Sequence, residues 1–120
     1  MSDHFRHGRL SYLQLPAVDV DASRAFYVGV LGWVAEGAGF EAPELIGQWV
    51  TDRPVSADGG PMLWLAVDHL DDVLDAVPAH GGTVERPPYP DGGERWLAEV
   101  RDPAGTPLGL VARADRPRRA

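Results

Sequence analysis

The first apolar pattern of the chain alternates from residue to residue. In the run Leu10–Leu15, Leu13 and Leu15 fall on one face while Tyr12 and Gln14 fall on the other. Successive side chains of a strand point to opposite faces of a sheet, so this pattern is typical of a strand with one buried face. The sequence therefore predicts a strand here.

The pattern then changes to a helical period. Ala22, Phe26 and Val30 recur at four-residue intervals, which places them on one stripe of a helix. Asp19 or Asp21 can cap the start of this helix, because an aspartate oxygen accepts hydrogen bonds from the free N–H groups of a first turn. A glycine after the last apolar position supplies a stop.

Short apolar runs bounded by turn residues predict the remaining strands. These strands are Trp33–Glu36, Phe40–Ala42, Leu45–Asp52, Met62–Val67, Thr83–Arg86, Arg95–Arg101 and Pro107–Ala112. Two stretches rich in proline and glycine, Arg53–Pro61 and Pro87–Gly93, predict loops.

A second helix is predicted to begin at Leu70 and to run to about Val77, with Asp68 as its cap. Pro78 lies near its end and has no N–H to donate. We expect a kink or a tightened last turn at this proline.

The order of elements repeats along the chain at an offset of about 50 residues. Val18-Asp19 precedes the first predicted helix as Val67-Asp68 precedes the second, and a glycine comes directly before the strand that follows each helix. Chance matching of common residue pairs is the alternative, but the order of elements matches as well. We expect one domain over residues 9–113, with modules at about 9–58 and 59–113 and flexible tails at 1–8 and 114–120.

Composition narrows the class of protein. A chain of 120 residues has the size of one domain. It has no cysteine, which excludes disulfides, thiolate metal sites and cysteine nucleophiles. The net charge of −7 disfavours nucleic acid as a partner. No apolar run approaches the ~20 residues of a membrane span, and the polar start has no signal-peptide pattern, so we expect no membrane partner and a cytoplasmic location.

Three motifs resemble one known family when they are taken together. They are D-V-D-A-S-R-A-F-Y at 19–27, V-L-G-W at 30–33 and D-P-A-G-T-P-L-G-L at 102–110. This combination resembles the vicinal oxygen chelate superfamily, also called the glyoxalase/bleomycin-resistance/dioxygenase superfamily. The resemblance covers about 9–113 and implies an α+β fold of two βαβββ modules. These modules would form a curled mixed sheet with a concave cleft and helices on the outer face. The resemblance also implies a homodimer.

The resemblance further implies where metal-dependent members hold their ion. The corresponding positions here are Tyr12, Met62 and Gly109, and a fourth falls near Glu44 or Gln48. Divalent cations bind to convergent sets of imidazole, carboxylate or thiolate groups, which the first three positions do not provide. We therefore expect no metal site and no cofactor.

A cleft lined by aromatic side chains and a few polar groups suits a planar or apolar small molecule. The alternation of side chains places Tyr12 and Gln14 on one face of the first strand. It places Met62 and Trp64 on the matching face of the fifth strand, where Trp49 or Trp96 can join them. The expected ligand-binding residues are Tyr12, Gln14, Trp49, Met62, Trp64 and Trp96. The alternative is that these side chains fill the core or a dimer interface.

Two classes of function follow from this cleft, and no catalytic residue is assigned. The first is a metal-free glyoxalase-like protein that binds a small apolar or aromatic molecule. The alternative is a lyase, isomerase or dioxygenase-like enzyme of the same superfamily, which would use a relocated metal or a carboxylate base such as Glu94 or Glu99. A structural partner module is a third reading.

Overall fold

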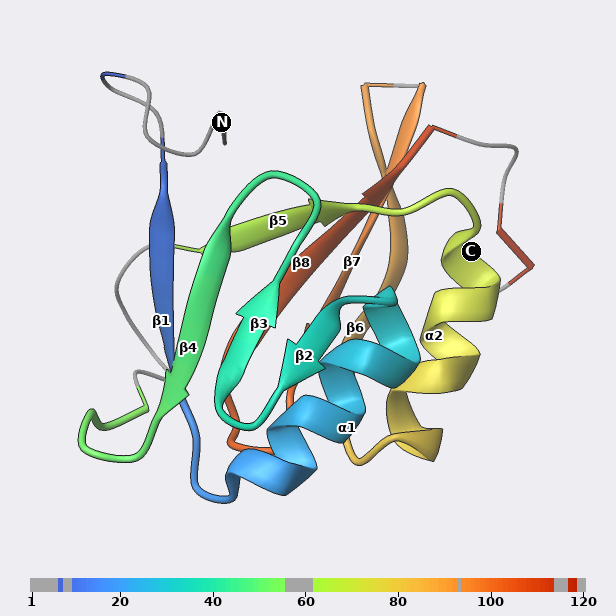
Figure 1. The fold of residues 1–120 in the computed structure, drawn as a ribbon. Helices are drawn as coiled ribbons and strands as arrows, with labels where there is room; N and C mark the ends of the chain where they lie inside the picture. Colours follow the sequence, from blue (N-terminus) through green and yellow to red (C-terminus); the bar gives the residue numbers. More distant parts are fainter. Residues whose placement is uncertain (1–6, 8–9, 56–61, 93, 114–116, 119–120) are drawn as a thin grey trace.

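The computed structural model of the chain describes residues 7, 10–55, 62–92, 94–113 and 117–118 (Figure 1). The fold is α+β and consists of two βαβββ modules, as predicted. Its elements are β1 (Tyr12–Pro16), α1 (Val20–Leu31), β2 (Val34–Glu36), β3 (Gly39–Glu41), β4 (Ile46–Val50), β5 (Leu63–Ala66), α2 (Leu70–Ala79), β6 (Thr83–Asp91), β7 (Arg95–Arg101) and β8 (Pro107–Ala112). Within the described part of the chain, neither helix is long and apolar enough to cross a membrane.

The two modules have the same strand connections. The first sheet has the order β1-β4-β3-β2 and the second the order β5-β8-β7-β6. In each sheet the first and last strands of the module pair in parallel, and the other pairs are antiparallel. The internal repeat is therefore a repeat of topology. The chain has two separate four-stranded sheets, which do not close into the single curled sheet that the resemblance implied.

The first helix is capped as its sequence predicts. The Asp19 carboxylate accepts hydrogen bonds from the N–H groups of Asp21 at 3.0 Å and Ala22 at 3.4 Å, so Asp19 is the cap. The helix ends at Gly32, which has a φ of 73°. This left-handed backbone conformation is open to glycine because it has no Cβ.

The second helix begins at Leu70 as predicted and runs to Ala79, two residues past the predicted end, but its cap is a different residue. Its N-cap residue is His69, which makes no side-chain capping bond, so the prediction of Asp68 as the cap is wrong. Pro78 lies in the last turn, where the His80 N–H bonds to the carbonyl oxygens of Ala76 at 3.1 Å and Val77 at 3.2 Å. A shared N–H of this kind is typical of a tightened last turn.

Strand β6 is longer than predicted, so the prediction of a loop over Pro87–Gly93 is wrong for most of that stretch. It runs over Thr83–Asp91, through three prolines that lie in the stretch Pro87–Gly93. Two features permit this. First, β6 is an edge strand, so a residue without an N–H can face away from the ladder. Second, the pairing register with β7 shifts between Val84 and Arg86 and again between Arg86 and Tyr89. The strand therefore continues where composition alone predicted a loop.

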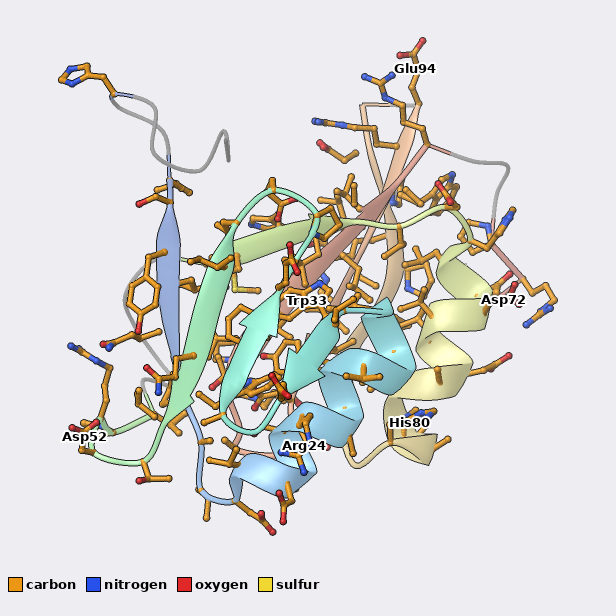
Figure 2. All side chains as sticks on the ribbon, in the orientation of Figure 1. Arg24, Trp33, Asp52, Asp72, His80 and Glu94 are labelled. Carbon is orange, nitrogen blue, oxygen red and sulfur yellow. The ribbon has the colours of Figure 1, made fainter. Side chains whose placement is uncertain are left out.

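Both modules contribute to one hydrophobic core, which lies on the helix-covered faces of the two sheets. Its first-module part is a group of packed aromatic rings around the buried Trp33, which is labelled in Figure 2. The ring centroids of Tyr27 and Trp33 lie 4.7 Å apart, those of Trp33 and Phe40 4.8 Å apart, and those of Phe40 and Trp49 4.8 Å apart. Trp49 is only 1% exposed, so it is a core residue.

A buried hydrogen bond joins the two modules. The Tyr27 hydroxyl of α1 donates to Asp102 Oδ2 at 2.8 Å, and Asp102 Oδ1 accepts from the N–H groups of Ala104 and Thr106, both at 2.9 Å. Burial raises the pKa of Asp102 above its ordinary 3.8, although these hydrogen bonds act in the opposite direction. Burial likewise raises the pKa of Tyr27. The turn after β7 is thus fixed to the first helix.

This carboxyl group predicts how the stability depends on pH. Because its pKa is raised on folding, the folded protein holds the proton more tightly than the unfolded chain. The resulting stabilisation is complete below the unfolded pKa and is lost as pH rises through the folded pKa. We expect the free energy of unfolding of the native protein, minus that of Asp102→Asn, to fall as the pH rises above the ordinary aspartate pKa of about 3.8. Urea denaturation measures it, and a difference that stays constant or grows with pH would contradict the assignment.

Candidate functional site

Each sheet has a second face, opposite to its helix, which we call its open face. On the first sheet the open face presents Tyr12, Gln14 and Gln48 from neighbouring strands. The Tyr12 hydroxyl donates to Gln48 Oε1 at 3.1 Å, and Gln14 Nε2 donates to the Tyr12 oxygen at 3.4 Å. Tyr12 is 50% exposed. The first sheet therefore offers a small polar network with one accessible phenol ring.

On the second sheet four residues form a line across the open face. Trp64 on β5 pairs with Gly109 on β8, Gly109 pairs with Glu99 on β7, and Glu99 pairs with Arg86 on β6. We call this line the cross-sheet row. Directly paired residues point to the same side of a sheet, so all four lie on the open face.

The indole of Trp64 lies across Gly109. A Cβ atom built on Gly109 would lie 2.1 Å from Trp64 Cε3 and 2.3 Å from Cδ2, which is far inside van der Waals contact. Only glycine leaves room for the ring at this place. Trp64 nevertheless remains 44% exposed, so one side of the indole packs on β8 and the other side is accessible.

At the other end of the cross-sheet row, two neighbouring side chains fix the Glu99 carboxylate. The Tyr89 hydroxyl donates to Glu99 Oε2 at 2.7 Å, and Arg86 Nη1 lies 3.6 Å from the same oxygen. The Arg86 guanidinium also lies over the Tyr89 ring, 3.6 Å from its centroid, as in a cation–π contact. Burial raises the pKa of the Tyr89 hydroxyl, and the bond to Glu99 raises it further. At neutral pH Tyr89 therefore stays a proton donor.

The predicted ligand-binding residues divide between the two faces. Tyr12, Gln14 and Trp64 are on open faces, and Met62 comes directly before β5 and is partly buried. Trp49 is in the core, and Trp96 is on the helix-covered face, where it pairs with the buried Ala112. The structure thus brings neither Trp49 nor Trp96 to an open face. Sequence reasoning missed Tyr89 because it lies in the predicted loop Pro87–Gly93. It missed Arg86 because its pairing with Glu99 depends on the register between two strands.

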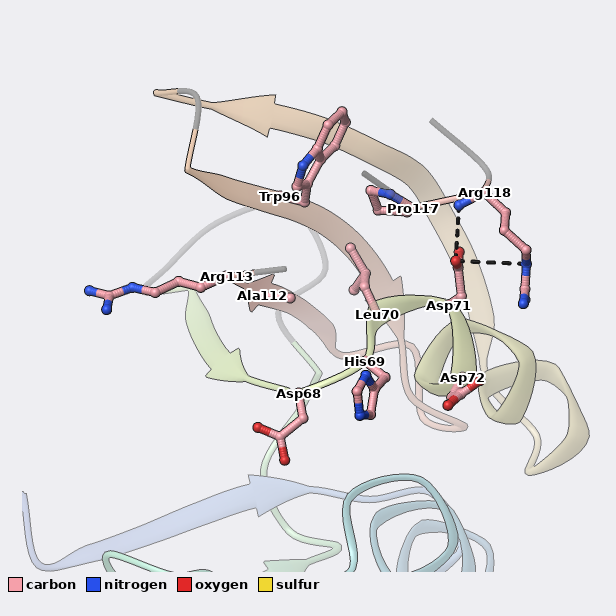
Figure 3. A pocket seen from close by; sticks show the side chains of 10 residues that line it. All are labelled: Asp68, His69, Leu70, Asp71, Asp72, Trp96, Ala112, Arg113, Pro117 and Arg118. Atoms are coloured by element: carbon pink, nitrogen blue, oxygen red, sulfur yellow. Dashed lines mark hydrogen bonds and ion pairs between the residues drawn. The ribbon is translucent and has the colours of Figure 1, made fainter. Parts of the chain in front are cut away.

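Trp96 instead lines a pocket of about 740 Å³ at the start of α2 (Figure 3). The C-terminal residues described in this region close one side of it. Pro117 is buried, and the Arg118 backbone N–H donates to Asp71 Oδ2 at 2.9 Å. Arg118 Nη2 also lies 3.4 Å from Asp75 Oδ2. Most of the predicted tail 114–120 lies outside the described residues.

The residues at the family's metal-binding positions do not fit a metal ion. The Tyr12 hydroxyl and Gln48 bond to each other, Met62 offers a thioether, and Gly109 has no side chain and is covered by an indole. Hard divalent cations need oxygen or imidazole ligands in a convergent set. Among the residues that the structure describes, no three His, Cys, Asp or Glu side chains lie close enough together to hold an ion.

Comparison with known proteins decides the family. The model of the "Glyoxalase/Bleomycin resistance protein/Dioxygenase superfamily" matches residues 9–110. The chain belongs to this superfamily. It is 30% identical to the protein CFP32 of Mycobacterium bovis, whose name describes it provisionally as a glyoxylase. That match covers 88% of this chain and 46% of the relative, so the chain spans about half the length of the curated relatives it matches.

Solved structures of the superfamily share the fold. A glyoxalase/bleomycin resistance protein from Albidiferax ferrireducens is 27% identical, with a TM-score of 0.69 over 86% of this chain and 98% of that one. A lactoylglutathione lyase from Agrobacterium tumefaciens is 21% identical, with a TM-score of 0.63 over 88% and 93% of the two chains. The second likeness shows the fold alone, and the activity of this glyoxalase-like chain follows from neither.

The contact between Trp64 and Gly109 predicts the effect of one added methyl group. In Gly109→Ala the new Cβ displaces the indole from β8, so we expect stronger quenching of tryptophan fluorescence by acrylamide. Gly39→Ala is the matched control, because a Cβ on Gly39 of the first open face meets no atom closer than 3.6 Å. Equal quenching in native protein and Gly109→Ala would show that the ring does not lie on Gly109.

Proposed function

We propose that this glyoxalase-like protein binds a small apolar or aromatic molecule on its open faces, without a bound metal. The observation that carries this proposal is the Trp64 indole, which lies across Gly109 and keeps one side accessible. A large flat ring that is fixed from below and open above is a platform for another flat ring, since aromatic pairs gain about 0.5–1.5 kcal/mol beyond their area burial.

The side chains at the superfamily's metal-binding positions are the reason for proposing a metal-free site. At the last-strand position an indole covers a glycine, and at the first-strand position a phenol is bonded to an amide. The indole and the glycine offer no ligand to a divalent cation, and the phenol and amide oxygens of Tyr12 and Gln48 are already bonded to each other without an imidazole or carboxylate beside them. Ring stacking and hydrogen bonds from side chains would therefore recognise the ligand, in the cytoplasm as the sequence predicts.

A second copy of the chain is the partner that we propose for each open face. Strands β1 and β5 are edge strands, and exposed edges readily pair with another chain. Leu10 and Trp64 are large exposed side chains and both line an apolar groove of about 400 Å³ between the two modules, with Leu13 and Leu63. Exposed apolar surface of this kind marks interaction sites. Pairing would bring two open faces together around a ligand.

A second candidate is a metal-independent enzyme of the superfamily, such as an isomerase or a lyase. The observation that favours it is the Glu99 carboxylate, which Tyr89 holds on the open face beside the covered glycine. A carboxylate in that place can act as a general base toward a ligand on the indole.

Titration with a panel of planar aromatic compounds tests the proposed function. We expect at least one compound to shift the tryptophan fluorescence of metal-stripped protein, and Trp64→Ala to weaken its binding about tenfold or more through the lost ring contact. Trp96→Ala, the same change on the helix-covered face, controls for general destabilisation. Dependence of binding on added Ni²⁺, Mn²⁺, Zn²⁺ or Fe²⁺ would contradict the metal-free proposal, and conversion of a compound would favour the enzyme.

Light scattering tests the pairing. We expect a solution mass twice the 13.0 kDa of one chain, because two edge strands and an apolar groove are otherwise left in water. Replacing Leu10, which is 76% exposed, with Asp should shift the mass toward one chain. Val18→Asp is the matched control, since Val18 is 77% exposed and does not line the groove. A native mass of one chain would contradict the proposal.

A further inference from the structure

We infer that Glu99 selects the ligand of the proposed site: it recognises planar molecules that carry an N–H or O–H donor at the edge of the ring. This inference rests on the proposed binding function and names the chemical class of the molecule bound.

Glu99 lies beside the Trp64 indole. Glu99 is the direct neighbour of Gly109 on the adjacent strand, and neighbouring strands lie about 4.8 Å apart. Because the Trp64 indole lies over Gly109, the carboxylate stands at the edge of the indole platform. A flat ring stacked on the exposed side of Trp64 therefore reaches Glu99 with its own edge.

The carboxylate is held from one side only. The Tyr89 hydroxyl and the Arg86 guanidinium both approach Oε2, at 2.7 Å and 3.6 Å. Arg86 is itself placed over the Tyr89 ring. Within the described chain no hydrogen bond is made to Oε1, and the Glu99 side chain is 30% exposed. One oxygen thus fixes the group, and the other is available to a ligand.

The chemistry of that free oxygen decides the class of ligand. An ionised carboxylate only accepts hydrogen bonds, and its bonds are roughly twice as strong as those between neutral groups. A phenol, an aryl amine or an N–H heterocycle supplies the donor that Oε1 lacks. An ether, a carbonyl or a carboxylate at the same edge meets a negative oxygen without a proton between them, and is disfavoured.

The experiment uses two probes with the same ring system, 2-naphthol and its methyl ether, in which a methyl group replaces the donor proton. Both are titrated calorimetrically into the native protein. We expect naphthol to bind about tenfold more tightly or better, as a hydrogen bond to a charged group implies. Glu99→Gln should lose most of this preference, because naphthol loses its bond to a charged oxygen while the ether no longer meets a negative oxygen and binds at least as well as to the native protein. Glu94→Gln is the matched control, because Glu94 lies at the tip of the β6–β7 turn (Figure 2).

The outcomes separate the two proposals. Equal binding of both probes to native protein, or a preference that survives in Glu99→Gln, overturns the role of Glu99 and leaves the binding function standing. Binding of neither probe overturns the binding function and this inference with it.

If Glu99→Gln does not fold, Tyr89→Phe keeps the ring under Arg86 and removes only the hydroxyl that fixes Oε2. We then expect a smaller preference with ether binding unchanged, and an unchanged preference would overturn the role of Tyr89 as a positioning residue for Glu99.

Discussion

The alternation of side chains along paired strands is the constraint on which this structure depends. Every strand gives one set of side chains to a core that both modules share, and the helices cover that side. The opposite set has no helix above it. The residues available for recognition are therefore fixed by parity and register. The buried bond between Tyr27 and Asp102 keeps the first helix against the turn of the second module, so the two halves of the core stay in contact.

Much of the fold was predictable because its signals are local. The Asp19 cap, the left-handed Gly32 and the strands Arg95–Arg101 and Pro107–Ala112 all follow from nearest neighbours along the chain. The family motifs then supplied the order of the modules. Strand β6 was not predictable in the same way. Its prolines are tolerated because it lies at an edge and slips in register, and both properties depend on which strand pairs with it.

The site residues were predictable where the alternation within a single strand determines the face on which a side chain lies. They were not predictable where the position depends on the register between two paired strands. Tyr12 and Gln14 follow from the alternation of their own strand. Trp49 is opposite Leu15 in the parallel pair β1–β4, and this register places it in the core. Trp96 shares its face with Ala98 and Val100, both buried, so the pattern of β7 already pointed inward. The same parity turns Glu99 outward, but its partners Tyr89 and Arg86 emerge only once β6 is seen as a strand.

The indole on Gly109 also bears on how such a protein can change during evolution. Any side chain introduced at position 109, a carboxylate included, collides with a ring that belongs to a different strand. A metal ligand at this position would thus require two substitutions in concert, with Trp64 replaced by a smaller residue before or together with the change at Gly109. Each single step on that path first loses a packed contact and gains nothing, so the covered glycine acts as a barrier between the two kinds of chemistry within one fold.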